Sequence, residues 1–179
     1  MVLSPEGGSE PQRTKLPEQR QSPNRDLVQP PLSVSLPHQL LRNARMSPIE
    51  MFNLDIQPGT TLKVKGKISE EAERFALNLG NSTDNLALHF NPRFNDPADG
   101  DVIVCNSKCD GNWDSEHRDT NFPFSKGSDF KFYITFKGDK FEIKLQNDHV
   151  IEFPNKTPLD KITYLTIYGD AKLVSVKFD

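Results

Sequence analysis

Apolar and polar residues alternate with a period of two from Met51 onward, and no segment shows the sustained period of an amphipathic helix. Pairs rich in Gly, Pro, Asn and Asp separate the alternating runs at hairpin spacing, as at Pro58-Gly59 and Gly169-Asp170. The pattern therefore predicts an all-β domain. The expected strands are residues 52–56, 61–68, 75–79, 86–91, 102–106, 130–136, 141–145, 150–153, 162–168 and 173–178.

The run from Phe130 to Phe136 indicates how these strands pack. Its even positions are large and apolar, whereas its odd positions include Lys131, Tyr133 and Thr135. This alternation suits the inner layer of two sheets that pack about 10 Å apart. We expect a sandwich rather than a closed barrel, with most of the 12 phenylalanines in its core.

Composition divides the chain at about residue 45. Residues 1–45 hold half of the 14 prolines and no Trp, Tyr, Phe or Cys, and their apolar residues follow no period. Such a composition is typical of disorder. We expect a disordered Pro-rich extension over 1–45 and one folded domain over 46–179. Met46 is a second candidate start of translation, and the sequence leaves both starts open.

Charge and hydropathy exclude several classes of function. The extension has a net charge of +2 and the domain one of −5, so we expect no nucleic-acid binding. No apolar run approaches the ~20 residues that span a bilayer, and the N-terminus does not resemble a signal peptide. These features predict a cytoplasmic protein without membrane insertion. Cys105 is expected in the core and Cys109 in a polar loop. Two thiols and the distant imidazole of His117 do not complete a tetrahedral zinc site, so no metal or cofactor is expected.

The run 86–94 carries the first candidate binding residues. Strand alternation places His89, Asn91 and Arg93 together on one face. An imidazole, a carboxamide and a guanidinium form an array of donors and acceptors that suits hydroxyl groups. The opposite face is expected to enter the core through Leu86, Leu88 and Phe90.

A second group of candidates follows in the polar stretch 108–118. Trp113, the only tryptophan, is interpreted either as a platform for the apolar face of a hexose or as a lid folded over the core. Glu116 and Arg118 are expected to share a strand face. There the carboxylate would orient Arg93 and Arg118 and accept a hydrogen bond from a ligand hydroxyl. A surface ion-pair network without a ligand would explain the same charges.

Together these motifs resemble the signature of the galectins, the galactoside-binding lectins. The motifs are His89-Phe90-Asn91-Pro92-Arg93, Val104-Cys105-Asn106 and Trp113-Asp114-Ser115-Glu116-His117-Arg118, and the similarity extends over residues 50–179. The resemblance implies a jelly-roll-like sandwich of two antiparallel sheets. It also implies binding of β-galactosides such as lactose and N-acetyllactosamine on the concave sheet, without metal or catalysis.

The resemblance also assigns roles to individual residues. It implies that the 4-hydroxyl of galactose is bound by His89, Asn91 and Arg93, and that Trp113 stacks on the sugar. The 6-hydroxyl would be held by Asn106 and Glu116, and the adjoining glucose or N-acetylglucosamine by Arg93, Glu116 and Arg118.

Two further positions bear on specificity. Arg74 matches a position where some galectins carry an arginine near the galactose 3-hydroxyl, so it is either a peripheral contact or a solvated edge charge. Pro97 stands where several members have a second histidine, and a ligand contact is expected to be missing there.

An enzyme and a protein-interaction protein are the alternatives to a lectin. A glycosidase needs two opposed carboxyl groups, and Asp114 would lie on the same side of the sugar as Glu116, so we expect no enzyme. A structural or protein-interaction protein of the galectin fold with little sugar affinity is the second alternative.

The resemblance further implies a homodimer through residues 51–56 and 173–178 that cross-links glycans of glycoproteins or glycolipids. It also implies export to the extracellular space without a signal peptide.

Overall fold

The computed structural model describes residues 46–157 and 159–179, and the extension predicted to be disordered lies outside these described residues. The described residues form strands and no helix. In chain order the strands are β1 Met46–Met51, β2 Thr61–Ile68, β3 Phe75–Gly80, β4 Leu86–Asp96, β5 Gly100–Cys109, β6 Asn112–Trp113, β7 His117–Asp119, β8 Asp129–Phe136, β9 Lys140–Lys144, β10 Val150–Pro154, β11 Tyr164–Gly169 and β12 Ala171–Phe178.

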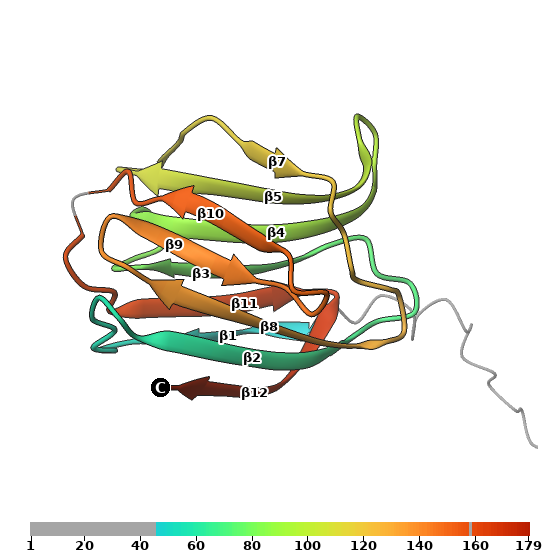
Figure 1. Cartoon of the computed structure of the whole chain (residues 1–179), viewed down its shortest axis with the longest axis horizontal. Coiled ribbons are helices and arrows are strands. Elements are labelled where there is room, and N and C mark those ends of the chain that lie inside the picture. Colours follow the sequence, from blue (N-terminus) through green and yellow to red (C-terminus); the bar gives the residue numbers. More distant parts are fainter. Residues whose placement is uncertain (1–45, 158) are drawn as a thin grey trace, which may run out of the picture. The chain divides into compact units, whose positions relative to one another are not determined.

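The strands form two antiparallel sheets that face each other as a sandwich (Figure 1). One sheet has seven strands in the order β1-β11-β3-β4-β5, with β6 and β7 both pairing with β5. The other has five strands in the order β10-β9-β8-β2-β12. The fold class predicted from the sequence is confirmed.

Aromatic rings from both sheets fill the space between them, as the alternation predicted. Phe90 of β4 lies 4.8 Å from Phe132 of β8, measured between ring centroids. Phe75 of β3 stacks on Phe130 at 5.1 Å. All four rings are buried. Contacts of this kind add to the free energy that burial of the rings itself contributes.

The strand expected at residues 52–56 is wrong. The first strand of the domain is β1, which ends at Met51 and pairs with β11. Asn53 has a φ of 56°, a left-handed conformation that interrupts a strand, and Ile56 makes only an isolated bridge to Ile162. The apolar alternation misled the prediction because Phe52 is exposed and lies against the Tyr164 ring instead of the core.

Candidate carbohydrate-binding site

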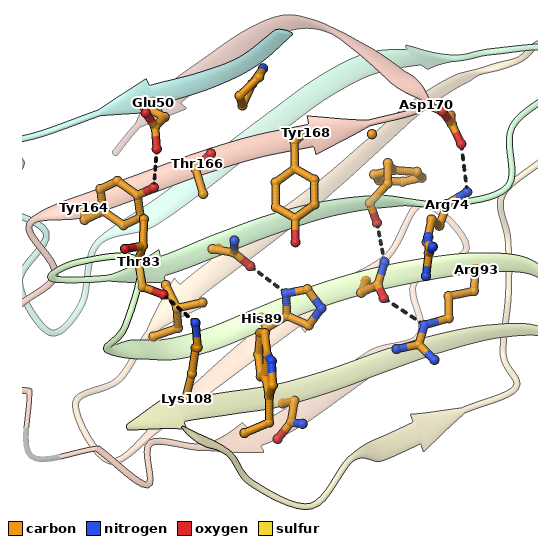
Figure 2. A pocket seen from close by; sticks show the side chains of 18 of the residues that line it. Glu50, Arg74, Thr83, His89, Arg93, Lys108, Tyr164, Thr166, Tyr168 and Asp170 are labelled. Atoms are coloured by element: carbon orange, nitrogen blue, oxygen red, sulfur yellow. Dashed lines mark hydrogen bonds between the residues drawn. The ribbon is translucent and has the colours of Figure 1, made fainter. Parts of the chain in front are cut away.

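A cleft of about 980 Å³ lies on the outer face of the seven-stranded sheet. Its lining comes from β1, β11, β3, β4, β5 and β6 and from the segments beside them (Figure 2). The structure brings seven of the eight predicted residues into this lining, namely Arg74, His89, Asn91, Arg93, Asn106, Trp113 and Glu116. Arg118 does not line the cleft but contacts Glu116.

Hydrogen bonds fix the polar face of β4 in place. Nδ1 of His89 lies 2.6 Å from Oδ1 of Asn78 on β3. Asn91 donates from Nδ2 to the backbone carbonyl of Phe75 at 2.8 Å. Arg93 in turn donates from Nε to Oδ1 of Asn91 at 2.8 Å. The three predicted side chains are therefore oriented by the protein itself.

The environment of His89 sets its protonation state. Burial lowers the pKa of its imidazole from 6.5 to about 4, and the charge of Arg93 acts in the same direction. The ring is therefore neutral at pH 7. Because the Asn78 amide oxygen can only accept, Nδ1 carries the ring proton, and Nε2 has a lone pair free to accept a hydrogen bond from a hydroxyl.

An ion-pair network at one end of the cleft holds Arg93, which lines the cleft, and Arg118 behind it. Glu116 receives hydrogen bonds from Arg93 at 3.0 Å and from Arg118 at 2.5 Å. Asp96 contacts both guanidiniums, Arg118 at 2.7 Å and Arg93 at 3.3 Å, and Asp99 accepts from Arg118 at 2.5 Å. Partial burial opposes ionisation of Glu116, yet the arginines lower the pKa of this carboxyl below its ordinary value. Glu116 is thus an ionised acceptor.

Trp113 forms one wall of the cleft. Its ring lies 4.8 Å from that of His89, measured between centroids, and the side chain is 50% exposed. The alternative of a lid folded over the core is therefore wrong. Asn106 donates to the backbone carbonyl of Asp114 at 2.8 Å, which anchors the segment that carries Trp113 and Glu116.

Leu86 is buried, as expected, but it lines the cleft and does not belong to the core cluster between the sheets. Leu79 of β3 pairs with Leu88 and Gly80 pairs with Leu86, so β4 contains one extra residue, Ala87, at this point. This β-bulge changes the phase of the side-chain alternation. Leu88 and Phe90 keep their predicted core positions.

Sequence reasoning missed the half of the cleft that β1 and β11 build. Tyr164, Thr166 and Tyr168 line it from β11, and the Tyr164 hydroxyl donates to Oε1 of Glu50 on β1 at 2.6 Å. Burial, followed by the Glu50 carboxylate, raises the pKa of Tyr164 to about 12. The available signal was the alternation of these polar positions with Leu165 and Ile167 in the predicted strand 162–168.

The two specificity positions differ in their placement. Arg74 lines the cleft immediately before β3. Its backbone pairs with that of Arg93 in an isolated antiparallel β-bridge. The two guanidiniums therefore lie near each other (Figure 2). The backbone N–H of Arg74 donates to Oδ2 of Asp170 at 3.1 Å. Pro97 lies in the turn between β4 and β5 and does not belong to the lining.

The remaining sequence expectations concern thiols, metals and membranes. Cys105 is buried, as predicted. Cys109 is exposed, but it is the last residue of β5 and not part of a loop. Both thiols are free. Over 46–157 and 159–179, no group of three or more His, Cys, Asp or Glu side chains is arranged to hold a metal ion. The same residues contain no helix long and apolar enough to cross a membrane.

Comparison with known proteins decides the family. The family model described as galactoside-binding lectin matches residues 49–178. The chain is 46% identical to Galectin-1 of Mus musculus over 127 residues, which cover 71% of this chain and 94% of that relative. The chain belongs to the galectin family. Galectins are carbohydrate-binding lectins and not enzymes, so the glycosidase alternative is excluded.

Solved structures agree with this assignment. This galectin resembles chicken Galectin 2 with a TM-score of 0.70 and 54% identity, covering 76% of this chain and 100% of that chain. A homodimeric agglutinin from chicken liver, CG-16, matches with a TM-score of 0.70 and 41% identity over 74% of this chain and 100% of its own. A toad ovary galectin in complex with thio-digalactose matches with a TM-score of 0.71 and 32% identity over 75% and 99%.

Proposed function

We propose that this galectin binds β-galactosides in the cleft and holds galactose with the predicted residues. The observation that carries the proposal is the array of His89, Asn91 and Arg93, which is fixed by hydrogen bonds and faces the half-exposed ring of Trp113. Nε2 of His89 accepts from a hydroxyl, and Arg93 donates to it. An axial hydroxyl of the sugar can form hydrogen bonds with both groups while the C–H face of the sugar packs against the Trp113 indole.

Selectivity for galactose follows from this arrangement. With the equatorial epimer, the polar groups on β4 would lose water without gaining a partner, which is costly for buried groups such as His89 and Asn91. Affinity is modest because an open cleft returns little more in hydrogen bonds than it loses in desolvation. We expect dissociation constants for disaccharides of about 0.1 to 1 mM, or roughly −4 to −5.5 kcal/mol.

The second part of the proposal is a homodimer that cross-links glycans of glycoproteins or glycolipids. Among the described strands, β1 and β12 are the edges of their sheets, and Val174 of β12 is 69% exposed. Edge strands with exposed apolar side chains are suited to pairing with a second copy. β1 takes the place that the sequence assigned to residues 51–56. The similarity to the homodimeric CG-16 supports the same arrangement. We also propose that the protein resides in the cytoplasm and is exported to the extracellular space.

Calorimetric titration with lactose tests the function, with cellobiose as the epimeric control. The full chain is compared with a fragment that starts at Met46. Binding of lactose alone by both proteins would support the proposal and show that residues 1–45 do not contribute to the site. Failure of both proteins to bind lactose would overturn it and favour a protein-interaction role. Sedimentation as a monomer at micromolar concentration would overturn the homodimer.

A further inference from the structure

The outer face of the five-stranded sheet carries a concentration of lysines that sugar binding in the cleft does not use. The odd positions of β2 place Lys63, Lys65 and Lys67 on this face, because the even positions are buried. Lys131 of β8 and Lys172 and Lys177 of β12 extend the group across neighbouring strands. These six residues are named the lysine face.

Strand register sets the lysines in rows across the sheet. Lys65 lies opposite Lys131 on one side and Ser175 on the other. Lys67 lies opposite Lys172, and Lys63 opposite Lys177. Neighbouring strands are about 4.8 Å apart and alternate residues of one strand about 7 Å apart. The Cα positions from which these lysines project therefore form a regular two-dimensional array on one surface.

The lysine face is not neutralised within the described part of the chain. None of its six ammonium groups forms an ion pair with a described carboxylate. Asp129 stands opposite Lys67, and Asp148 is paired with Lys144 at 2.9 Å and interacts more weakly with the charge of Lys131. Glu142, on the same side of the sheet, is 3.6 Å from Lys140.

This concentration contrasts with the charge of the domain as a whole. Residues 46–179 carry a net charge of −5, so acidic groups must predominate elsewhere. Several of them lie in the cleft or in its arginine network, among them Glu50, Asp96, Asp114 and Glu116. Like charges placed next to each other destabilise a sheet, so a sheet face of this kind is suited to a polyanion that neutralises it.

We propose that the lysine face binds a linear sulfated polysaccharide. Lysines are point charges without the planar fork of arginine, and they suit a flexible polyanion whose counterions are released on binding. The strand spacing is similar to the length of one sugar unit, so successive sulfates can meet lysines on successive strands. The face belongs to the other sheet from the cleft, which leaves the galactoside site open.

Nucleic acids fit this surface less well. Tyr133 lies opposite Lys63 at the border of the face. Its ring centroid is 5.5 Å from the Lys63 ammonium and 5.9 Å from that of Lys131, and these contacts leave the ring poorly placed to stack on an unpaired base. The broad sheet also offers no helix or two-stranded ribbon to enter the major groove of a duplex. The observations therefore favour a sulfated glycan.

Binding of heparin to the full-length protein tests the proposal, measured by titration at several salt concentrations. The test variant is Lys65→Gln with Lys131→Gln, two residues that are cross-strand neighbours. Its matched control is Lys126→Gln with Lys161→Gln, which removes the same charge from exposed positions outside the face. We expect the test variant to bind heparin about tenfold more weakly, with a salt slope smaller by roughly 1 to 2, and the control to match the wild type.

Three further arms separate this site from the cleft and from other polyanions. Saturating lactose should leave heparin binding unchanged, and desulfated heparin should not bind. The test variant should bind lactose with the dissociation constant of the wild type. This titration also separates a failure of the lysine-face proposal from a failure of the proposed galactoside binding. Equal loss in the control variant, or displacement by lactose, would overturn the proposal. So would a DNA duplex or phosphatidylserine vesicles that bind as tightly as heparin.

Discussion

Nδ1 of His89 donates its proton to Oδ1 of Asn78 across 2.6 Å, and this contact determines which ring nitrogen faces the cleft as an acceptor. Asn78 is buried on β3 and His89 on β4, so the tautomer is fixed by two neighbouring strands and not by the ligand. A side chain so fixed pays little ordering entropy when a sugar binds.

Lactose affinity should be constant from pH 8 to about 5 and should fall as the pH approaches 4. The pKa of His89 is lowered to about 4 by burial, so the acceptor at Nε2 survives until that range. Titrations across this range measure the effect. A loss of affinity near pH 6.5 would contradict the inferred state of the ring.

The free energy of unfolding should respond at higher pH than binding does. His89 has a pKa of 6.5 in the unfolded chain and about 4 in the fold, so the unfolded state takes up this proton first. As far as this group is concerned, the free energy of unfolding is highest above pH 6.5. It declines as the pH falls from 6.5 towards 4, by on the order of 3 kcal/mol in total. Urea unfolding of the wild type and of His89→Gln should show a shallower decline in the variant between pH 6.5 and 4.

Trp113→Ala should weaken lactose binding by more than tenfold and change the free energy of unfolding by less than about 1 kcal/mol. The side chain is 50% exposed and forms a cleft wall, so it contributes more to binding than to the core. Since it is the only tryptophan, lactose should also shift the intrinsic fluorescence of the wild type. Phe178→Ala removes an exposed aromatic from β12 and should leave lactose affinity unchanged.

Glu116→Gln should reduce lactose affinity by roughly tenfold, because the neutral amide no longer holds both arginines and accepts a hydrogen bond more weakly. Arg93 and Arg118 would then be held chiefly by Asp96 and Asp99. Glu152→Gln is the matched control, since Glu152 pairs with Lys140 at 2.9 Å on the other sheet. Similar losses in both variants would argue against a role in orientation.

Arg74→Ala should distinguish the two interpretations of Arg74. We expect lactose itself to bind within about twofold of the wild type, because this guanidinium lies beyond the predicted galactose contacts. Lactose sulfated at the galactose 3-hydroxyl should bind the wild type more tightly than lactose does, and the variant should lose that gain. Equal affinity of the wild type for both sugars would show that Arg74 is a solvated edge charge.

Strand periodicity predicted the parts of this structure that depend on local alternation. The runs 61–68 and 130–136 became β2 and most of β8, with their even positions buried. His89, Asn91 and Arg93 met in the cleft for the same reason. These predictions succeed because side-chain direction along a regular strand depends only on position.

Features that arise from pairing between distant segments were not predictable in this way. The extra residue in β4 that turns Leu86 into the cleft depends on the register with β3. The contacts of Arg118 with Asp96 and Asp99 join β7 to the end of β4 and the turn after it. β6 has only two residues, too few to show a period.

The hydrogen-bonded order of His89, Asn91 and Arg93 also bears on the kinetics of binding. A site that needs no rearrangement can associate at about 10⁵ to 10⁷ M⁻¹s⁻¹, and with a millimolar constant the bound sugar would leave within about 0.1 to 10 ms. A single site would then release its glycan almost as soon as it captured it. The time that the protein stays on a densely glycosylated surface would depend on how quickly a freed site binds a neighbouring galactose.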